Sequence, residues 1–298
     1  MWRAEVVADS LNTATGDRLT TFCLQYPRLP VHEHFLTHRM LSRNTRSNRA
    51  VSTARLAEQP LFVPTDWRLD DRRMRQEHAL PDDAVCRARR LWVAAAVGAE
   101  GWARRLAELG VHRQTANRLM EPFKYTTTVA TATDWPWWFR LRCAGDAQGE
   151  TQRLARMMLE AYAASTPVPR EPGAWHLPFV TPEDVERASG MDDPAGHLCR
   201  LSTARCARVS TLTFEGRLDP CADLRLHDEL VDGQEWSPFE HAARAFAYGP
   251  RDAGYAANLR GWRQYRALFP SSYDASPLRP EEVEALLAGR CPPVPSAA

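Results

Sequence analysis

Residues 37–49 bring together side chains of the kinds that bind phosphate groups. The segment reads THRMLSRNTRSNR and contains cationic, hydroxyl and amide groups. Arginine offers a planar fork of donors to a phosphate, and serine and threonine hydroxyls add single donors. This composition suits a phosphorylated ligand, but a solvated, arginine-rich loop would have the same composition. Only the spacing of the residues distinguishes the two interpretations.

Two further segments contain arginine, glutamine or histidine residues that could act at a binding or catalytic site. The second segment has Arg118 shortly before Pro122, then a stretch rich in threonine and valine, and then Arg142 and Gln148. The third contains ARCARVS at 204–210 and SPFEH at 237–241, which ends in His241. From residue types alone, the two arginines could be helix caps or surface ion pairs. His241 could equally be a buried, hydrogen-bonded core histidine.

The spacing of the first segment resembles the signature of the flavin-dependent thymidylate synthases. That signature, His-Arg-x-x-Ser-x-Asn-x-x-Ser-x-Arg, is matched here by His38, Arg39, Ser42, Asn44, Ser47 and Arg49. The chain departs from the family at Thr37, where arginine is usual, and at Thr45, where an acidic residue is common. A subgroup with THRxxSRNxxSSRA is closer, apart from Arg46 and Asn48.

The resemblance implies roles for residues of the first segment. Contacts with the nucleotide are implied for His34, Ser47, Asn48 and Arg49. Contacts with the flavin are implied for Thr37, His38, Arg39 and Asn44. Ser47 would also lie at the catalytic centre. The solvated loop is then the less favoured interpretation.

The resemblance also covers the second and third segments. It implies that Arg118 binds the nucleotide phosphate and that Gln148 contacts the flavin. Arg142 would act at the uracil ring, where a cation stabilises charge that develops on O2 or O4. His241 would be a catalytic residue near the flavin and the folate. In most of the family the third segment precedes the signature, so the order here is predicted to be circularly permuted.

Aromatic and cysteine residues give weaker indications. The run 135–138, WPWW, could offer a face to a flavin or pterin ring, although core packing is the more usual role of such clusters. Cys221 follows a proline, as does the nucleophile of the flavin-free thymidylate synthases, but it is predicted to be structural. The seven cysteines are odd in number and include no CxxC pair, which favours a reducing cytoplasm and argues against a zinc site.

The elements that must position these residues are predicted from periodicity, caps and breakers. Strands are expected at 5–7, 19–25, 125–133 and 200–214. Helices are expected at 83–109, at 112–120 with an end before Pro122, at 146–164, after Thr181, at 220–233 and at 280–289. The tail 291–298 is predicted to be disordered. The expected architecture is an α+β fold forming a single domain over residues 1–298.

Composition narrows the range of partners. The formal net charge is +1, the pI is about 7.7, and 44% of the residues are apolar. Such a chain can bury a substantial core. Its net charge is too small to produce the long-range electrostatic field that a nonspecific nucleic-acid or membrane-surface binder relies on. Of the 38 basic residues only Lys124 is a lysine. The first ten residues include charged side chains where a signal peptide needs an apolar run, and no apolar run in the chain is long enough to span a bilayer. No membrane partner is therefore expected.

The resemblance implies a flavin-dependent enzyme that methylates C5 of UMP, dUMP or both. Methylenetetrahydrofolate would be the one-carbon donor, reduced FAD the hydride source and NADPH the reductant, in a homotetramer whose sites involve more than one subunit. Thr37 and the altered serine-rich part favour a specialised member that accepts UMP, as in nucleoside-antibiotic pathways. The alternatives are a strict dUMP thymidylate synthase and a non-catalytic nucleotide- or RNA-binding protein.

Overall fold

The computed structural model describes residues 2–37, 41–47, 51–69, 78–145, 147–209, 219–247, 258–269 and 279–289. In these ranges two sheets are present, with strand orders β3-β4-β2-β1-β5 and β6-β7-β8. The strands are β1 (Arg3–Asn12), β2 (Arg18–Pro27), β3 (Ser42–Thr45), β4 (Tyr125–Ala132), β5 (Val168–Arg170), β6 (Trp175–His176), β7 (Ala243–Ala245) and β8 (Trp262–Gln264).

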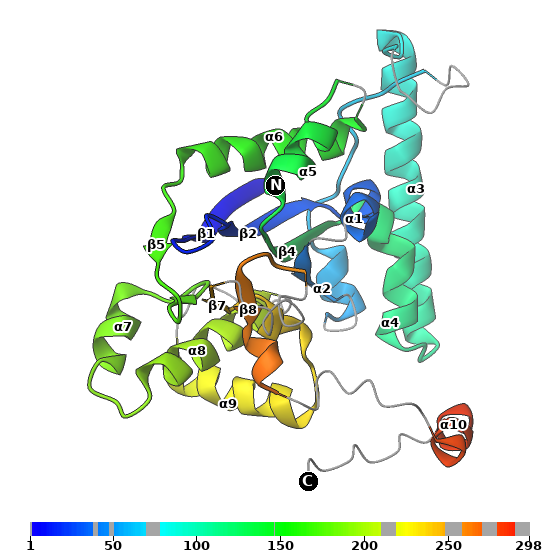
Figure 1. The fold of residues 1–298 in the computed structure, drawn as a ribbon. Helices are drawn as coiled ribbons and strands as arrows, with labels where there is room; N and C mark the ends of the chain where they lie inside the picture. Colours follow the sequence, from blue (N-terminus) through cyan, green and yellow to red (C-terminus); the bar gives the residue numbers. More distant parts are fainter. Residues whose placement is uncertain are drawn as a thin grey trace.

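Helices surround the larger sheet (Figure 1). The α-helices are α1 (Arg28–Thr37), α2 (Thr53–Ala57), α3 (Asp82–Glu108), α4 (Arg113–Ala116), α5 (Trp135–Arg142), α6 (Gly149–Ala164), α7 (Pro182–Ala188), α8 (Pro194–Val209), α9 (Pro220–Asp232) and α10 (Pro280–Leu287). The 3-10 helices are η2 (Asn117–Phe123), η3 (Ser237–Glu240) and η5 (Tyr265–Leu268). The mixture of a mainly antiparallel sheet with helices is the predicted α+β fold. None of the described helices is both long and apolar enough to cross a membrane.

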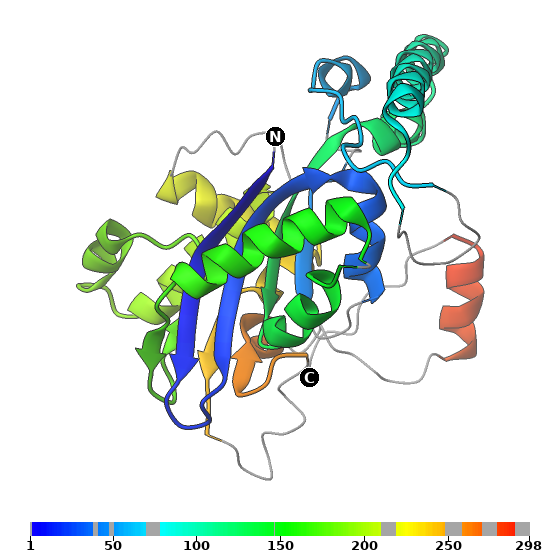
Figure 2. The ribbon, with the colours of Figure 1, turned by 90° about the horizontal axis from the view of Figure 1, so that it is seen from above.

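Strand alternation gives the larger sheet two buried faces. Along β2, Phe22, Leu24 and Tyr26 point to one face, where they pack with residues of α1, α5 and α6. Figure 2 shows α6 lying across β1 and β2 on this side. Cys23 points to the other face and packs with residues of α8. Because side chains alternate with a period of two, each strand contributes to both cores. We refer to these sides as the α1 face and the α8 face.

The predicted strands at the start of the chain and at 125–133 are confirmed, and the first two are longer than expected. The helices predicted at 83–109, after Thr181, at 220–233 and at 280–289 are also present, and that at 146–164 begins at Gly149. The predicted helix at 112–120 is instead α4 followed by η2, which continues through Pro122 to Phe123. A proline removes only one backbone donor, and the amide of Lys124 closes this turn onto the carbonyl of Glu121.

The strand predicted for residues 200–214 is wrong as far as the structure describes them. Residues 200–209 belong to α8, and 210–214 lie outside the described residues, as does the tail 291–298. The helix starts well before the family-like sequence, where the Asp193 carboxylate accepts a hydrogen bond from the amide of Gly196 at 2.9 Å. Once begun, it continues to Val209 because its side chains are buried on several sides. The local sequence alone does not report this packing, because it depends on elements elsewhere in the chain.

A buried cluster of ion pairs joins α7, α8 and α9. Arg205 is fully buried, and its Nε donates to Asp223 at 2.9 Å while Nη2 donates to Asp184 at 3.0 Å. Burial alone would raise the pKa of Asp184, but hydrogen bonds from Arg205 lower it to about 2. Asp223 also accepts from Nε of Arg208 at 2.6 Å. Arg205, the first of the two arginines in the family-like ARCARVS sequence, therefore holds three helices together.

Arg205→Ala is predicted to lower the free energy of unfolding by about 3–5 kcal/mol, because it leaves buried carboxylates without their main partner. Arg200→Ala is the matched control, since Arg200 lies on the same helix and pairs with Asp228 near the surface. It should cost less than about 1 kcal/mol. Urea unfolding of both variants measures the difference. Equal losses would contradict the role given to Arg205.

Candidate functional site

The signature segment forms the edge strand β3, and strand alternation divides its side chains between the two faces. Ser42 pairs in register with Thr131 of β4, and Thr45 pairs with Thr128. Ser42 and Asn44 point to the α8 face, whereas Arg43 and Thr45 point to the α1 face. A single four-residue strand thus supplies two polar clusters, one on each side of the sheet.

On the α8 face, the signature side chains bind segments that come late in the sequence. The Ser42 hydroxyl accepts hydrogen bonds from Gln264 at 2.8 Å and from Asn258 at 3.1 Å. The Asn44 amide donates to the carbonyl of Cys206 on α8 at 3.0 Å. Asn44, predicted to contact the flavin, therefore also fixes β3 against α8. The first and third segments, more than 150 residues apart in the chain, lie side by side here.

His241 follows η3 and lies fully buried beside β4. Its Nδ1 is 2.8 Å from the Thr131 hydroxyl. Its Nε2 is also buried and has no hydrogen-bond partner among the described residues. The core-histidine interpretation is correct for the Nδ1 side of the ring. The other nitrogen is a polar atom that a ligand or water could satisfy, and its desolvation makes such a partner favourable.

The Thr131 hydroxyl continues a row of buried polar groups. It lies 2.7 Å from the Thr21 hydroxyl, which in turn lies 2.8 Å from Nε2 of His176. Nδ1 of His176 lies 2.9 Å from the Ser10 hydroxyl. Burial lowers the pKa of both His176 and His241 to about 3. Both rings are therefore neutral at physiological pH.

On the α1 face, a second cluster surrounds Tyr26. Its hydroxyl lies 2.7 Å from that of Thr128, which lies 3.0 Å from that of Thr45. Burial, together with the charges of Arg43 and Arg28, lowers the pKa of His32 to about 4. Nη1 of Arg43 is buried and has no hydrogen-bond partner within the described ranges. A buried guanidinium nitrogen without a partner favours the binding of an anionic ligand.

The basic cluster extends along the edge of the sheet toward Ser47. Arg46 is buried, and its Nη2 donates to the Gln59 side chain at 2.8 Å and to the carbonyl of Tyr125 at 2.7 Å. Arg28 donates to the carbonyl of Arg46 at 3.0 Å. Arg28 also lies 3.5 Å from Glu121 of η2. Arg46 therefore has a structural role immediately before Ser47.

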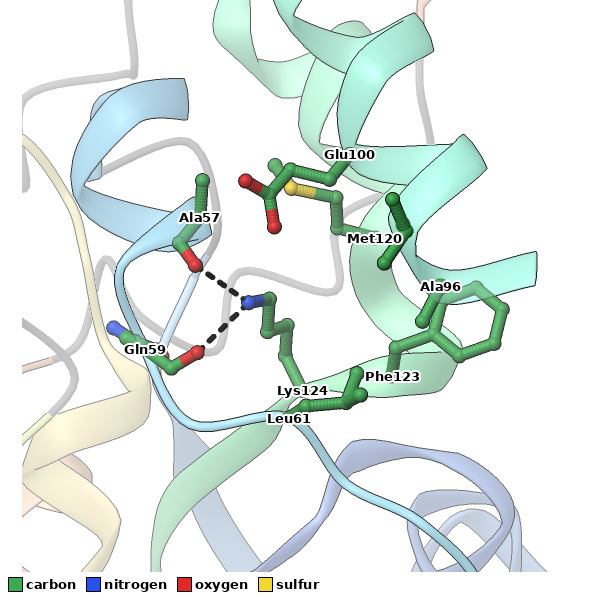
Figure 3. Close-up of a pocket in the computed structure, with 9 residues that line it drawn as sticks. Ala57, Gln59, Leu61, Ala96, Glu100, Met120, Phe123 and Lys124 are labelled. Carbon is green, nitrogen blue, oxygen red and sulfur yellow. Dashed lines mark hydrogen bonds between the residues drawn. The ribbon is translucent and has the colours of Figure 1, made fainter. Parts of the chain in front are cut away.

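Lys124 supports the same region from a small cavity of about 110 Å³. Its Nζ donates to the carbonyls of Ala57 and Gln59, both at 2.8 Å (Figure 3). Gln59 thus accepts from Lys124 through its backbone and from Arg46 through its side chain. Because burial disfavours the charged amine, the pKa of Lys124 is lowered. The only lysine of the chain fixes the loop that holds Arg46.

Arg142 lies at the end of α5, on the α1 face. Its guanidinium carbon is 5.6 Å from the centre of the Trp138 ring, and burial lowers its pKa. Trp138 stacks on Phe35 with a centroid distance of 4.6 Å. Trp135 and Trp138 are core residues, as the more usual interpretation of the WPWW run predicted, whereas Trp137 is 50% exposed.

The other predicted site residues are distributed around the signature strand. Arg118 is exposed on η2, while His34 and Ser47 are partly buried on α1 and after β3. Gln148 caps α6, because its side-chain oxygen accepts from the amide of Thr151 at 2.9 Å. Thr37 is the last residue of α1. The remaining predicted site residues, His38, Arg39, Asn48 and Arg49, lie outside the described residues.

Several functional candidates were not singled out from sequence. Arg43, Thr131 and His176 carry chemistry only because of where the fold places them. Strand alternation around Ser42 and Asn44 could have assigned Arg43 to the opposite face. No local signal pairs His176 with Thr21, since these residues are 155 positions apart.

The fold and these side chains define an α+β protein with a candidate site for an anionic ligand at strand β3. Residues 19–168 match the family model described as thymidylate synthase complementing protein. This range is half of the chain and includes the signature and the second segment. The chain belongs to this family, whose members depend on FAD, and is a nucleotide methyltransferase of the thymidylate synthase type.

Among solved structures, the chain is similar to the UMP/dUMP methylase PolB from Streptomyces cacaoi. The crystal structure with 5-Br dUMP has a TM-score of 0.45 and 18% identity, covering 55% of this chain and 90% of that chain. The one with 5-Br UMP has a TM-score of 0.44 and 19% identity, covering 55% and 89%. No curated protein matches the sequence. The family match, not this distant likeness, identifies the chain.

The free energy of unfolding is predicted to decrease as the pH falls from about 6.5 to 5. His176 and His241 have a folded pKa of about 3, against an ordinary value near 6.5. The unfolded chain therefore binds more protons in this range, which costs on the order of 2 kcal/mol per histidine at pH 5. Urea titrations at several pH values measure the slope. A free energy that stays constant from pH 7 to 5 would show that these rings are not buried neutral.

Proposed function

We propose that the chain methylates C5 of UMP, dUMP or both, with FAD as cofactor, methylenetetrahydrofolate as one-carbon donor and NADPH as reductant. The observation that carries this proposal is the family match over residues 19–168, which contains the signature strand. Two features of the site agree with it. One is the buried Arg43 atom without a partner, and the other is the equally buried Nε2 of His241.

The residues present fit a flavin and a nucleotide. A flavin ring offers carbonyl and nitrogen atoms, which a buried imidazole nitrogen can meet as hydrogen-bond partners. Arg118, Ser47 and Arg49 would hold the nucleotide phosphate. His38, Arg39, Asn44 and Gln148 would hold the cofactor, and Thr37 stands where an arginine contact is usual. When bound, reduced FAD supplies the hydride that completes the methyl group, and NADPH restores its reduced state.

The protein's own part is to bind, orient and polarise. Arg142 would lie at the uracil ring and stabilise charge on its carbonyl oxygens. Burial raises the thiol pKa of Cys143, the cysteine nearest to Arg142 in the chain. A thiol held in its protonated form is a weak nucleophile. This supports activation of C5 by the cofactor and by positioning, without a covalent cysteine adduct at this position.

We infer that the sites form between subunits of a homotetramer. Arg142 belongs to a helix on the α1 face, whereas His241 binds Thr131 on the α8 face. The sheet therefore separates Arg142 from His241 within one subunit, although the proposed reaction needs both residues close to the same bound ligands. A neighbouring subunit can supply the missing side. Helix α3 offers a contact surface, because Leu91 and Trp102 are 72% and 59% exposed and lie on one helical face.

The absorption spectrum of the purified protein is predicted to show flavin bands near about 375 and 450 nm. Tritium should be released from 5-tritiated UMP or dUMP when methylenetetrahydrofolate and NADPH are present. The faster nucleotide identifies the substrate, and release from dUMP alone would identify a strict thymidylate synthase. If FAD neither copurifies nor binds on addition and neither nucleotide releases tritium, the proposed function is wrong.

Arg118→Ala is predicted to raise the KM for the nucleotide roughly 10- to 100-fold, with a smaller change in kcat, because a charge-assisted phosphate contact is lost. Arg113→Ala is the matched control, since Arg113 is exposed on the neighbouring helix α4. Steady-state kinetics of both variants measure the effect. Equal KM values in the two variants would remove Arg118 from the phosphate site.

Trp102→Glu is predicted to reduce the assembly to smaller species, because a carboxylate replaces an apolar contact on α3. Arg104→Glu on the same helix reverses a charge without removing apolar surface and is the control. Analytical ultracentrifugation of wild type and both variants measures the mass. A wild-type monomer, or an unchanged assembly in Trp102→Glu, would contradict this interface.

A further inference from the structure

Among the described residues, five buried side chains form one unbranched file of hydrogen bonds. They are Ser10, His176, Thr21, Thr131 and His241, in that order, and they come from β1, β6, β2, β4 and the end of η3. All are at most 2% exposed. The four links are between 2.7 and 2.9 Å long, so each holds a proton in a well-formed hydrogen bond.

The number of protons in this file is fixed. Each of the three hydroxyl groups carries one proton, and each neutral imidazole carries one. Five protons therefore serve four hydrogen bonds, and the fifth must lie at one end of the file. It lies either on Nε2 of His241 or on the Ser10 hydroxyl, directed away from His176. The tautomers of the two histidines are consequently coupled, because moving the fifth proton from one end to the other reverses every link.

The two ends are not equivalent. With the fifth proton on Nε2 of His241, Ser10 donates to His176, and among the described residues the Nε2 proton and the lone pairs of the Ser10 oxygen lack partners. With the proton at Ser10, the buried Ser10 hydroxyl proton and the Nε2 lone pair of His241 both lack partners within the part of the chain that the structure describes. Each arrangement leaves one buried donor and one acceptor without a partner, but the second leaves the stronger acceptor unused, because an imidazole nitrogen accepts hydrogen bonds more strongly than a hydroxyl oxygen that already donates. The first arrangement is therefore favoured.

We propose that Ser10, His176, Thr21 and Thr131 act as positioning residues that hold His241 in the Nε2–H tautomer, so that it donates a hydrogen bond to an acceptor atom of the bound ligand. The acceptor class is a ring carbonyl oxygen or an unprotonated ring nitrogen. Identifying that ligand as the flavin rests on the function proposed above. The tautomer itself does not, because it follows from contacts within this chain.

The file also explains why threonine at position 131 matters. A hydroxyl group both accepts and donates, so it can transmit the direction of the file from Thr21 to His241. Valine has the same shape but neither capacity. Thr131→Val should therefore release the tautomer of His241, while Thr131→Ser should preserve it. Thr126, on the same strand, is buried with a hydroxyl that has no partner in the described chain, and Thr126→Val is the matched control.

The test is solid-state nitrogen NMR of the full-length protein labelled with 15N-histidine. His176→Gln and His241→Gln assign the two signals. We expect both rings as Nε2–H tautomers in wild type, Thr131→Ser and Thr126→Val, and a mixture at His241 in Thr131→Val. Ser10→Ala should produce a mixture at His176. A wild-type Nδ1–H tautomer at either ring overturns the proposal, as does an unchanged His241 signal in Thr131→Val.

A second measurement separates this inference from the proposed function. FAD titrations followed by absorbance should give a dissociation constant roughly 3- to 10-fold higher for Thr131→Val than for Thr126→Val, as expected for one neutral hydrogen bond. If FAD fails to bind any variant while the tautomers are as predicted, the proton file holds and the proposed cofactor is wrong. If FAD binds all variants equally, His241 does not donate to it and the ligand part of the inference fails.

Discussion

The pairing of β3 with β4 is the interaction on which the candidate site depends. Ser42 opposite Thr131 and Thr45 opposite Thr128 fix which signature side chains reach each face of the sheet. A slip of one residue would direct Arg43 toward α8 and remove Ser42 from Gln264 and Asn258. Side-chain hydrogen bonds at both ends of the strand prevent that slip. The register of four residues therefore controls two polar clusters.

Buried polar groups in this protein are satisfied in different ways. Arg205 retains its charge in the core because two carboxylates surround it. His176 and His241 are neutral there, and threonine hydroxyls link them without adding charge. Arg43 follows neither pattern, since its buried Nη1 has no partner among the described residues. Departures of this kind are expected where a ligand completes the structure.

The aromatic and cysteine residues clarify what kind of chemistry the site can support. Trp135 and Trp138 are part of the core that α1 and α5 form with the sheet, and Trp138 positions Arg142 through packing. Burial raises the thiol pKa of Cys23 to about 11 and that of Cys206 further, and both lie in the interior on the α8 face. These thiols fill space, and the polar chemistry is concentrated in arginine, histidine and hydroxyl groups around β3 and β4.

The sequence by itself determined the signature residues, the family and most elements with strong local signals, such as α3 and the proline-led starts of α7 and α9. It also predicted the threonine-rich strand β4 that carries Thr131. Only the tertiary structure decided that residues 200–209 are helical and that Asn44 and Arg46 have structural partners. It alone joined Thr21 to Thr131 and to His176, across 110 and 155 positions. Periodicity and caps report interactions within a few residues, whereas hydrogen bonds between distant strands exist only once the sheet has formed.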